Sequence, residues 1–226
     1  MSQSRLVYQS NIWQEEAEAN NPFAAQAYFC HGYDVYKHIV PNATWIESLF
    51  LLFKGERPSS QQAQLLEKVA VILSHTSIRD ASVRAAMNSG VSGATHAATL
   101  MAALAVGAGQ YGGSHEVNLA MQLWQRCGCD LGQWQSHLLA YQQPKTAHHV
   151  ADIWHDIEHP IGFDPNCPQC PTPILQALTL LAELSDGQAL KWLYQQRAIL
   201  EQTVNASLAL TGVMAAAFYD LGFDEH

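Results

Sequence analysis

Residues 80–106 read DASVRAAMNSGVSGATHAATLMAALAV, and this stretch decides the expected fold class. Alanine, glycine and other small residues dominate it, and small residues allow helix axes to approach one another closely. The stretch therefore predicts helices that are buried among other helices. Ala-rich helices interrupted by glycine also suit an interface between subunits, so that alternative stays open.

Helical signals continue on both sides of this stretch. Upstream, Thr44 is a good N-cap with Glu47 three residues later, which is a capping box, and Gly55 ends the helix that they begin. Apolar residues at helical spacing predict further helices that open at Ser59 and that cover residues 116–126, 131–142, 173–184 and 188–212, the last continuing through 213–221. No convincing alternating strand is present. We therefore expect an all-α fold, in which residues 1–30 form an N-terminal arm with a short helix and residues 31–226 form one helical domain.

Composition narrows the function classes. Only 11 of the 226 residues are Lys or Arg, they are scattered, and the formal net charge is −9. This argues against nucleic acid as a partner, because phosphate binding needs clustered basic residues, and against a membrane surface for the same reason. Charged residues make up 14% of the chain, which is low for a fully wet surface and favours a thick core or a partner subunit.

The sequence also sets an expected compartment. No apolar run approaches the roughly 20 residues that span a bilayer, and the first residues lack the apolar core of a secretory signal. We therefore expect a cytoplasmic protein, in which the five cysteines are reduced, bind metal or act in catalysis.

Two irregular segments interrupt the predicted helices. Residues 107–116 read GAGQYGGSHE, and residues 155–167 read HDIEHPIGFDPNC. Both combine histidine, acids and glycine next to helix ends, where unpaired N–H groups and loops converge to form sites. These segments are therefore the candidate functional loops.

Both segments resemble motifs of a known superfamily. Residues 109–116 (GQYGGSHE) resemble the G-x-L-H-G-G-A-N-E turn of citrate synthases and the G-D-R-F-G-G-A-L-D turn of citryl-CoA lyases and of the lyase part of ATP citrate lyase. Residues 159–165 (HPIGFDP) resemble the G-H-P-x…D-P-R loop of the synthases. In the same order, HGYD (31–34), SLFLLFKGERP (48–58) and VNAS (204–207) resemble R-G-Y-D, Y-L-L-L-x-G-E-L-P and N-V-D-G.

This resemblance to the citrate synthase/citryl-CoA lyase superfamily implies a homodimeric, citrate synthase-like helical bundle. It implies a coenzyme A thioester as substrate, together with a carboxylic acid. The implied chemistry is the formation or cleavage of a C–C bond, as in an acyltransferase or a lyase. The resemblance also implies that Gly112, Gly113, Ser114, His115 and Asp164 bind the substrate or the coenzyme.

The departures from the family pattern bear on activity. Tyr111 stands at the position of the synthases' first histidine, His159 at that of the second, and Ser207 at that of the aspartate that takes the proton from the acyl-CoA methyl. Serine does not replace a carboxylate base near neutral pH. We expect weak or altered activity. The alternative is an inactive member that binds coenzyme A, a carboxylate or another subunit.

Several readings of single residues stay open. Asp164, Glu116 or Glu158 becomes a relocated base if its carboxylate points into the pocket. His115 is a new base or a residue of the first helical turn, and Asp164 otherwise forms a turn by bonding the backbone. Tyr111 is a substrate-facing hydroxyl or a packed ring, and His159 is a ligand-facing side chain or a helix cap.

The cysteines provide a rival hypothesis. Cys127 and Cys129 form one close pair, and Cys167 and Cys170 form another. Two such pairs supply a zinc site with four thiolate ligands, and His148, His149 and His155 lie between them. A redox role for the second pair is disfavoured because no βαβ context surrounds it. No metal is firmly predicted.

Overall fold

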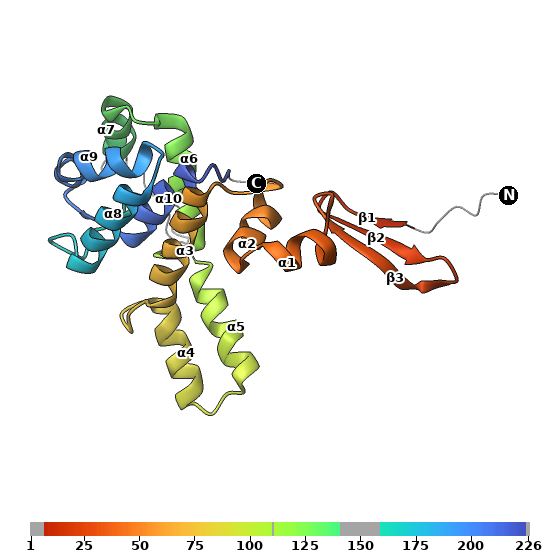
Figure 1. The fold of residues 1–226 in the computed structure, drawn as a ribbon. Coiled ribbons are helices and arrows are strands. Elements are labelled where there is room, and N and C mark those ends of the chain that lie inside the picture. Colours follow the sequence, from red (N-terminus) through yellow and green to blue (C-terminus); the bar gives the residue numbers. More distant parts are fainter. Residues whose placement is uncertain (1–6, 110, 141–158, 225–226) are drawn as a thin grey trace. The chain divides into compact units, whose positions relative to one another are not determined.

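A computed structural model describes residues 7–109, 111–140 and 159–224 (Figure 1). The described chain is mostly helical with small sheets. It divides into two units, residues 1–67 and 68–226, and the boundary falls within α3 (Ser60–Ser74). No helix of the described ranges combines the length and the apolar character that crossing a bilayer needs.

The N-terminal unit begins with an antiparallel sheet. Its strands follow the chain order, β1 (Val7–Gln9), β2 (Trp13–Glu18), β3 (Asn21–Cys30) and β4 (Tyr33–Asp34). The prediction of an arm with a short helix and no strand is wrong here. Alanines in β3 hide the alternation, and its aromatic side chains provide the packing: the ring centroids of Tyr28 and Trp13 are 5.4 Å apart across the β2–β3 pair.

Short helical segments follow the sheet, and they bring the chain to the first long helix. They are the π-helix η1 (Val35–Ile39) and α1 (Val40–Asn42), followed by α2 (Trp45–Lys54). The capping box is confirmed, because the Thr44 hydroxyl accepts from the Glu47 N–H and the Glu47 carboxylate accepts from the Thr44 N–H. Gly55 ends α2 in the left-handed conformation, with φ of 76°.

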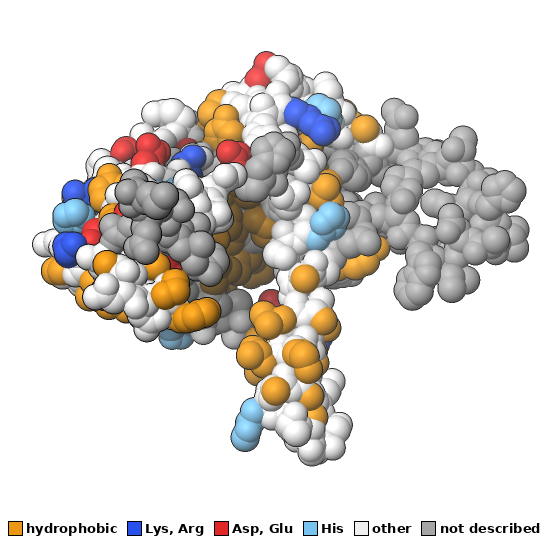
Figure 2. All heavy atoms as spheres, turned by 90° about the vertical axis from the view of Figure 1, so that its right-hand side faces the viewer, with side chains coloured by type: hydrophobic (Ala, Val, Ile, Leu, Met, Phe, Trp, Pro, Cys, Tyr) orange, Lys and Arg blue, Asp and Glu red, His pale blue; other side chains and the backbone are white. Residues whose placement is uncertain are grey.

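In the second unit, the Ala-rich stretch forms a helical hairpin. Helices α4 (Ala81–Val91) and α5 (His96–Gly107) pack side by side (Figure 1). The prediction that this stretch is buried among other helices is wrong for the single chain, since neither helix has a buried residue. Hydrophobic side chains gather on its surface (Figure 2), and those of Leu100, Met101 and Leu104 are each at least 60% exposed.

The core of the second unit lies among the remaining helices. These are α6 (Ser114–Cys127), α7 (Leu131–Ala140), α8 (Thr172–Leu184), α9 (Ala189–Val204) and α10 (Leu210–Asp220). The α10 residues Thr211 to Ala217 are all buried, and α10 packs against α6, α8 and α9. The Trp124 ring contacts those of Trp134, Trp192 and Tyr219 at centroid distances of 4.9, 5.6 and 5.7 Å, which fixes α6 against α7, α9 and α10.

The predicted helix over residues 188–212 is interrupted. Helix α9 ends at Val204 because Asn205 takes the left-handed conformation, with φ of 53°, as asparagine does at helix C-termini. The chain then forms β6 (Ser207–Leu208), which pairs with β5 (Phe163–Asp164), before α10 begins. This break brings residue 207 beside the loop of residues 159–164.

Asp220 caps α9 from the end of α10, and its removal should weaken the second unit. Its carboxylate accepts from the N–H groups of Ala189 and Leu190, at 2.8 and 3.1 Å, and from the Ser185 hydroxyl at 2.7 Å. We expect Asp220→Ala to lower the free energy of unfolding by about 2 kcal/mol, because a helix cap and a charged acceptor are lost together. Urea denaturation measures this. Asp186→Ala, which removes an exposed aspartate between α8 and α9, should leave the free energy of unfolding nearly unchanged. An equal loss of stability in the two variants would contradict the capping role of Asp220.

Candidate functional site

A buried carboxylate joins the candidate loops. Glu116 lies in the first turn of α6, and only 1% of it is exposed. Its Oε2 accepts from the Gly112 N–H at 2.6 Å. Its Oε1 accepts from the Gly162 N–H at 2.9 Å and from the Thr211 hydroxyl at 3.1 Å. Segments 111–116, 159–164 and 207–212 thus meet around one side chain, and we call them the Glu116 site.

His159 completes the surroundings of this carboxylate. Its Nε2 lies 3.5 Å from Glu116 Oε1, and its side chain is 12% exposed. Burial raises the Glu116 pKa, but the hydrogen bonds from His159, Gly112 and Gly162 outweigh burial and hold that pKa below its ordinary value. Glu116 is therefore an anion at neutral pH, and it orients the His159 ring by hydrogen bonding and charge.

The glycine turn between α5 and α6 is tight for two separate reasons. A Cβ on Gly113 would lie 2.7 Å from the Gly107 carbonyl oxygen and 2.8 Å from the Gly109 nitrogen, so the position has no room for a side chain. Gly112 has open space but a φ of 70°, which is unfavourable for residues with a Cβ. The predicted turn is confirmed, and both Gly112 and Gly113 are needed in it.

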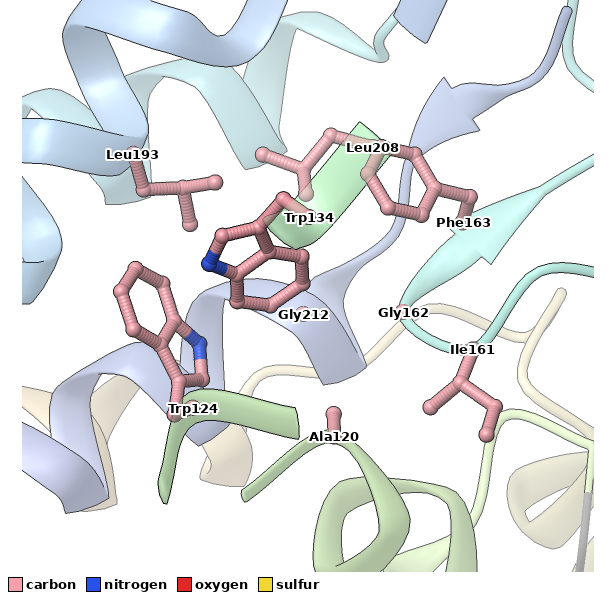
Figure 3. A pocket seen from close by; sticks show the side chains of 9 residues that line it. All are labelled: Ala120, Trp124, Trp134, Ile161, Gly162, Phe163, Leu193, Leu208 and Gly212. Atoms are coloured by element: carbon pink, nitrogen blue, oxygen red, sulfur yellow. The ribbon is translucent and has the colours of Figure 1, made fainter. Parts of the chain in front are cut away.

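A second close approach of backbones lies behind the site. Gly162 has a φ of 82°, and its carbonyl oxygen accepts from the Ala209 N–H at 3.0 Å. A Cβ on Gly212 would lie 2.6 Å from that same carbonyl oxygen. Both glycines border a cavity of about 10 Å³ among Trp124, Trp134 and other apolar side chains (Figure 3). This volume suits about one water molecule, so the cavity is part of the core.

Ser207 and Asp164 face each other across the β5–β6 pair. Ser207 is 3% exposed, and its hydroxyl donates to the Asp164 carbonyl oxygen at 3.4 Å. The Asp164 carboxylate accepts from the Asn166 N–H at 2.8 Å, which is the turn-forming role. Position 207 thus provides a hydroxyl at the Glu116 site, where the motif that it resembles has an aspartate.

The remaining predicted residues lie on the surface of the site. Tyr111 is 55% exposed, and its ring centroid lies 5.4 Å from that of His159. It is therefore not a ring packed in the core. Ser114 and His115 are exposed in the first turn of α6. Tyr111 and His159 together present a phenol and an imidazole at one edge of the glycine turn.

The hypothesis that Glu116 or Asp164 acts as a relocated base finds little support in the structure. Both oxygens of Glu116 are occupied by donors, and its lowered pKa makes it a poor proton acceptor. Asp164 bonds the backbone of its own turn. Glu158 lies outside the described residues. Neither of the two described candidates, Glu116 and Asp164, is therefore placed to act as the base.

Metal ligands do not gather in the described ranges. No group of three or more His, Cys, Asp or Glu side chains is placed there to hold a metal ion. Cys127 is buried and Cys129 exposed, whereas Cys167 and Cys170 are partly exposed. His148, His149 and His155 of the zinc hypothesis lie outside the described residues.

Sequence reasoning missed three residues that build the site. Thr211 and Gly212 fell inside a predicted helix, and Gly162 was quoted only as part of a motif. Asn205, which favours the left-handed conformation, is the signal that could have ended the helix early and revealed the strand. The N-terminal unit also holds a groove of about 460 Å³ lined by Tyr33, His38, Asn42, Glu47 and Arg57, but no predicted site residue lies there.

Solved structures provide the comparison with known proteins. The chain is similar to citryl-CoA lyase from Hydrogenobacter thermophilus, with a TM-score of 0.68 and 17% identity, over 96% of this chain and 78% of that one. It is also similar to ATP citrate lyase from Methanothrix soehngenii in complex with citrate and coenzyme A, with a TM-score of 0.65 and 15% identity, over 97% of this chain and 33% of that one. No family model and no curated protein sequence matches the chain.

Similarity at these identities shows the fold. The chain has the citrate synthase-like helical fold of citryl-CoA lyase, so the relation inferred from the motifs is confirmed at the level of the fold. The chain spans a third of the ATP citrate lyase, which contains much that has no counterpart here.

Proposed function

We propose that this chain binds an acyl-CoA thioester and a carboxylic acid at the Glu116 site, and makes or breaks a C–C bond between them with weak or altered activity. One observation carries the proposal. Two segments that resemble the superfamily's motifs, far apart in the sequence, meet at one buried carboxylate through Gly112 and Gly162, and Thr211, four residues after the third motif, bonds the same carboxylate. The fold is similar to that of a citryl-CoA lyase, and the ATP citrate lyase of similar fold was solved in complex with citrate and coenzyme A. The expected cytoplasmic location is part of this proposal.

The roles follow from the groups present. The Nε2 of His159 is directed at Glu116, so its other ring nitrogen serves the acid, as a donor to a carboxylate when the ring is protonated and as an acceptor from a hydroxyl when it is neutral. Tyr111 is exposed beside it and can donate a hydrogen bond to a developing enolate oxygen. Backbone N–H groups at the start of α6 favour an anion there. Ser207 offers a hydroxyl where the family has a carboxylate, and losing a general base typically costs about 10²–10⁴-fold in rate.

Binding without turnover is the second candidate function. The serine at position 207 favours this candidate, because a hydroxyl does not take a carbon-bound proton. The nearby Asp164 carboxylate does not replace the base, since it bonds the backbone of its own turn. Both candidates predict ligand binding at the same place, and only the first predicts release of free coenzyme A.

The test combines binding with turnover. We expect calorimetry with coenzyme A, acetyl-CoA, oxaloacetate and citrate to show binding of at least one of them. Turnover of acetyl-CoA with oxaloacetate, or of citryl-CoA in reverse, should be far below that of ordinary synthases. His159→Ala should lower the affinity for the carboxylic acid at least tenfold. His137→Ala, which changes a partly exposed histidine of α7, should leave this affinity unchanged. Absence of binding by all ligands would refute the proposal.

Ser207→Asp distinguishes weak activity from none. The new carboxylate would face Asp164 across the β5–β6 pair, and a like charge so close raises a carboxyl pKa, which suits a base. A measurable rise in release of coenzyme A would support the catalytic candidate. If ligands bind but neither the wild type nor Ser207→Asp turns over, the binding candidate stands.

We further propose that the chain forms a homodimer through the α4–α5 hairpin. Leu100, Met101 and Leu104 expose a continuous apolar turn of α5, and a helix that is apolar all round is normally buried. Sedimentation velocity should give twice the chain mass of 24.9 kDa. Met101→Glu should dissociate the dimer, whereas Leu180→Glu, at an exposed leucine of α8, should not. A wild-type monomer at micromolar concentration would contradict this.

A further inference from the structure

The Cys167-Pro-Gln-Cys170 segment connects β5 to α8. The Cys167 N–H donates to the Asp164 carbonyl oxygen at 3.4 Å, and the chain bends at Pro168 and Gln169. The bend lies between the two cysteines, and the charge of Cys167 is one of the causes that raise the Cys170 pKa. Both thiols are partly exposed and unpaired. A pair of accessible thiols therefore lies at the turn that follows β5.

The two cysteines lie beside the paired strands. The Cys170 thiol donates to the Leu208 carbonyl oxygen of β6 at 3.8 Å, and the Asp164 side chain of β5 is the chief cause that raises the Cys167 pKa. β5 and β6 are the strands that bring Ser207 and Asp164 together. The reduced pair therefore borders the strands of the Glu116 site.

We propose that Cys167 and Cys170 form a reversible oxidation site, which is converted to an intramolecular disulfide by exchange with a small disulfide of the glutathione class. In the first step, the Cys167 thiolate attacks the small disulfide, forms a mixed disulfide and releases one glutathione thiolate. In the second, the Cys170 thiolate attacks the Cys167 sulfur, closes the ring and releases the other. Two electrons pass to the small disulfide, and the two thiol protons go to the leaving thiolates.

The surroundings of the thiols set the rate of this exchange. The hydrogen bond to Asp164, followed by burial, raises the pKa of Cys167, and burial chiefly raises the pKa of Cys170. Only the thiolate attacks a disulfide. Exchange should therefore be slow near neutral pH and should accelerate as the pH rises toward the thiol pKa values.

The disulfide changes the donors available to both strands. It has no S–H group, so the Leu208 carbonyl oxygen loses the hydrogen bond from Cys170, and the Asp164 carboxylate no longer has a thiol beside it. An effect on ligand binding rests on the proposed function, whereas formation of the disulfide does not. If citrate or coenzyme A binds at the Glu116 site, oxidation should change its affinity severalfold.

The experiment treats the full chain with excess oxidised glutathione at increasing pH, blocks the free thiols and maps the peptides by mass spectrometry. We expect a Cys167–Cys170 link that reductant reverses and that forms faster at higher pH. Cys167→Ser and Cys170→Ser should each abolish the link, whereas Cys129→Ser, which removes an exposed thiol elsewhere, should not. A stable mixed disulfide on either cysteine without ring closure, or no reaction at alkaline pH, would overturn the proposal.

Ligand titration separates this result from the fate of the proposed function. If the link forms and no ligand binds either state, the oxidation site stands and the proposed function fails. If ligands bind and no link forms, the reverse holds. Cys167→Ser cannot form the link and leaves the Cys170 thiol in place as the donor to Leu208, so it should bind ligand like the reduced protein even after treatment with the oxidant. A fall in its affinity on treatment would contradict control by the disulfide.

Discussion

Gly113→Ala is expected to lower the free energy of unfolding by about 3 kcal/mol or more, and to abolish ligand binding at the Glu116 site. The reason is lack of space. A Cβ at this position would approach the carbonyl oxygens of Gly107 and Gly109 and the Gly109 nitrogen. These atoms belong to the backbone and cannot move aside as the end of a side chain does. Urea denaturation and calorimetry would measure the two effects.

Two other glycines provide the controls. Gly90→Ala lies inside α4, where an added Cβ meets nothing within 4 Å, so it should be neutral or stabilise by about 0.5–1 kcal/mol. Gly112→Ala should cost about 1–2 kcal/mol, because its φ of 70° strains a residue with a Cβ although space is free. A Gly113→Ala protein as stable as Gly90→Ala would show that the turn tolerates a side chain.

Glu116→Gln is the second change with a large expected effect, a loss of about 3 kcal/mol in the free energy of unfolding. Both carboxylate oxygens accept hydrogen bonds from N–H or O–H donors. The amide nitrogen of glutamine would face one of these donors, leaving two buried donors opposed. Glu183→Gln, at an exposed glutamate of α8, should be within about 0.5 kcal/mol of the wild type.

The pH dependence of this loss gives a sharper readout. The Glu116 pKa is lowered in the folded chain relative to its ordinary value of 4.5. Its contribution to stability is therefore fully present above pH 4.5 and is lost as the pH falls through the folded pKa. The stability difference between the wild type and Glu116→Gln should thus be constant above about pH 4.5 and shrink as the pH falls below that value. A difference that stays constant as the pH falls below 4.5 would mean that the Glu116 pKa is not lowered in the folded state.

Local signals predicted helices well and long-range pairing poorly. The Thr44–Glu47 capping box and Gly55 mark α2 because capping depends on neighbouring residues. The β5–β6 pair joins Phe163 to Leu208, and neither two-residue strand shows an alternating pattern that a sequence scan detects. The strands of the N-terminal sheet were missed for another reason, because the alanines of β3 hide its alternation.

Most residues of the site were predicted from the sequence, but the role of Glu116 at its centre was not. Motifs pointed to His159, Ser207 and the glycine turn, and these lie near one another. Glu116 was considered only as a base, although it serves as the common acceptor for Gly112, Gly162 and Thr211. Which donors surround a carboxylate depends on tertiary packing, so residue type and spacing do not reveal it.

The two side chains of strand β6, Ser207 and Leu208, point to different parts of the molecule. Neighbouring side chains of a strand point to opposite faces. Leu208 borders the apolar cavity beside Trp134 (Figure 3), so Ser207 projects away from that part of the core. Mutations at position 207 can therefore alter reactivity with little loss of hydrophobic packing. Under the proposed function, a carboxylate could be lost or regained at position 207 while the demand for stability fell mainly on Leu208 beside it.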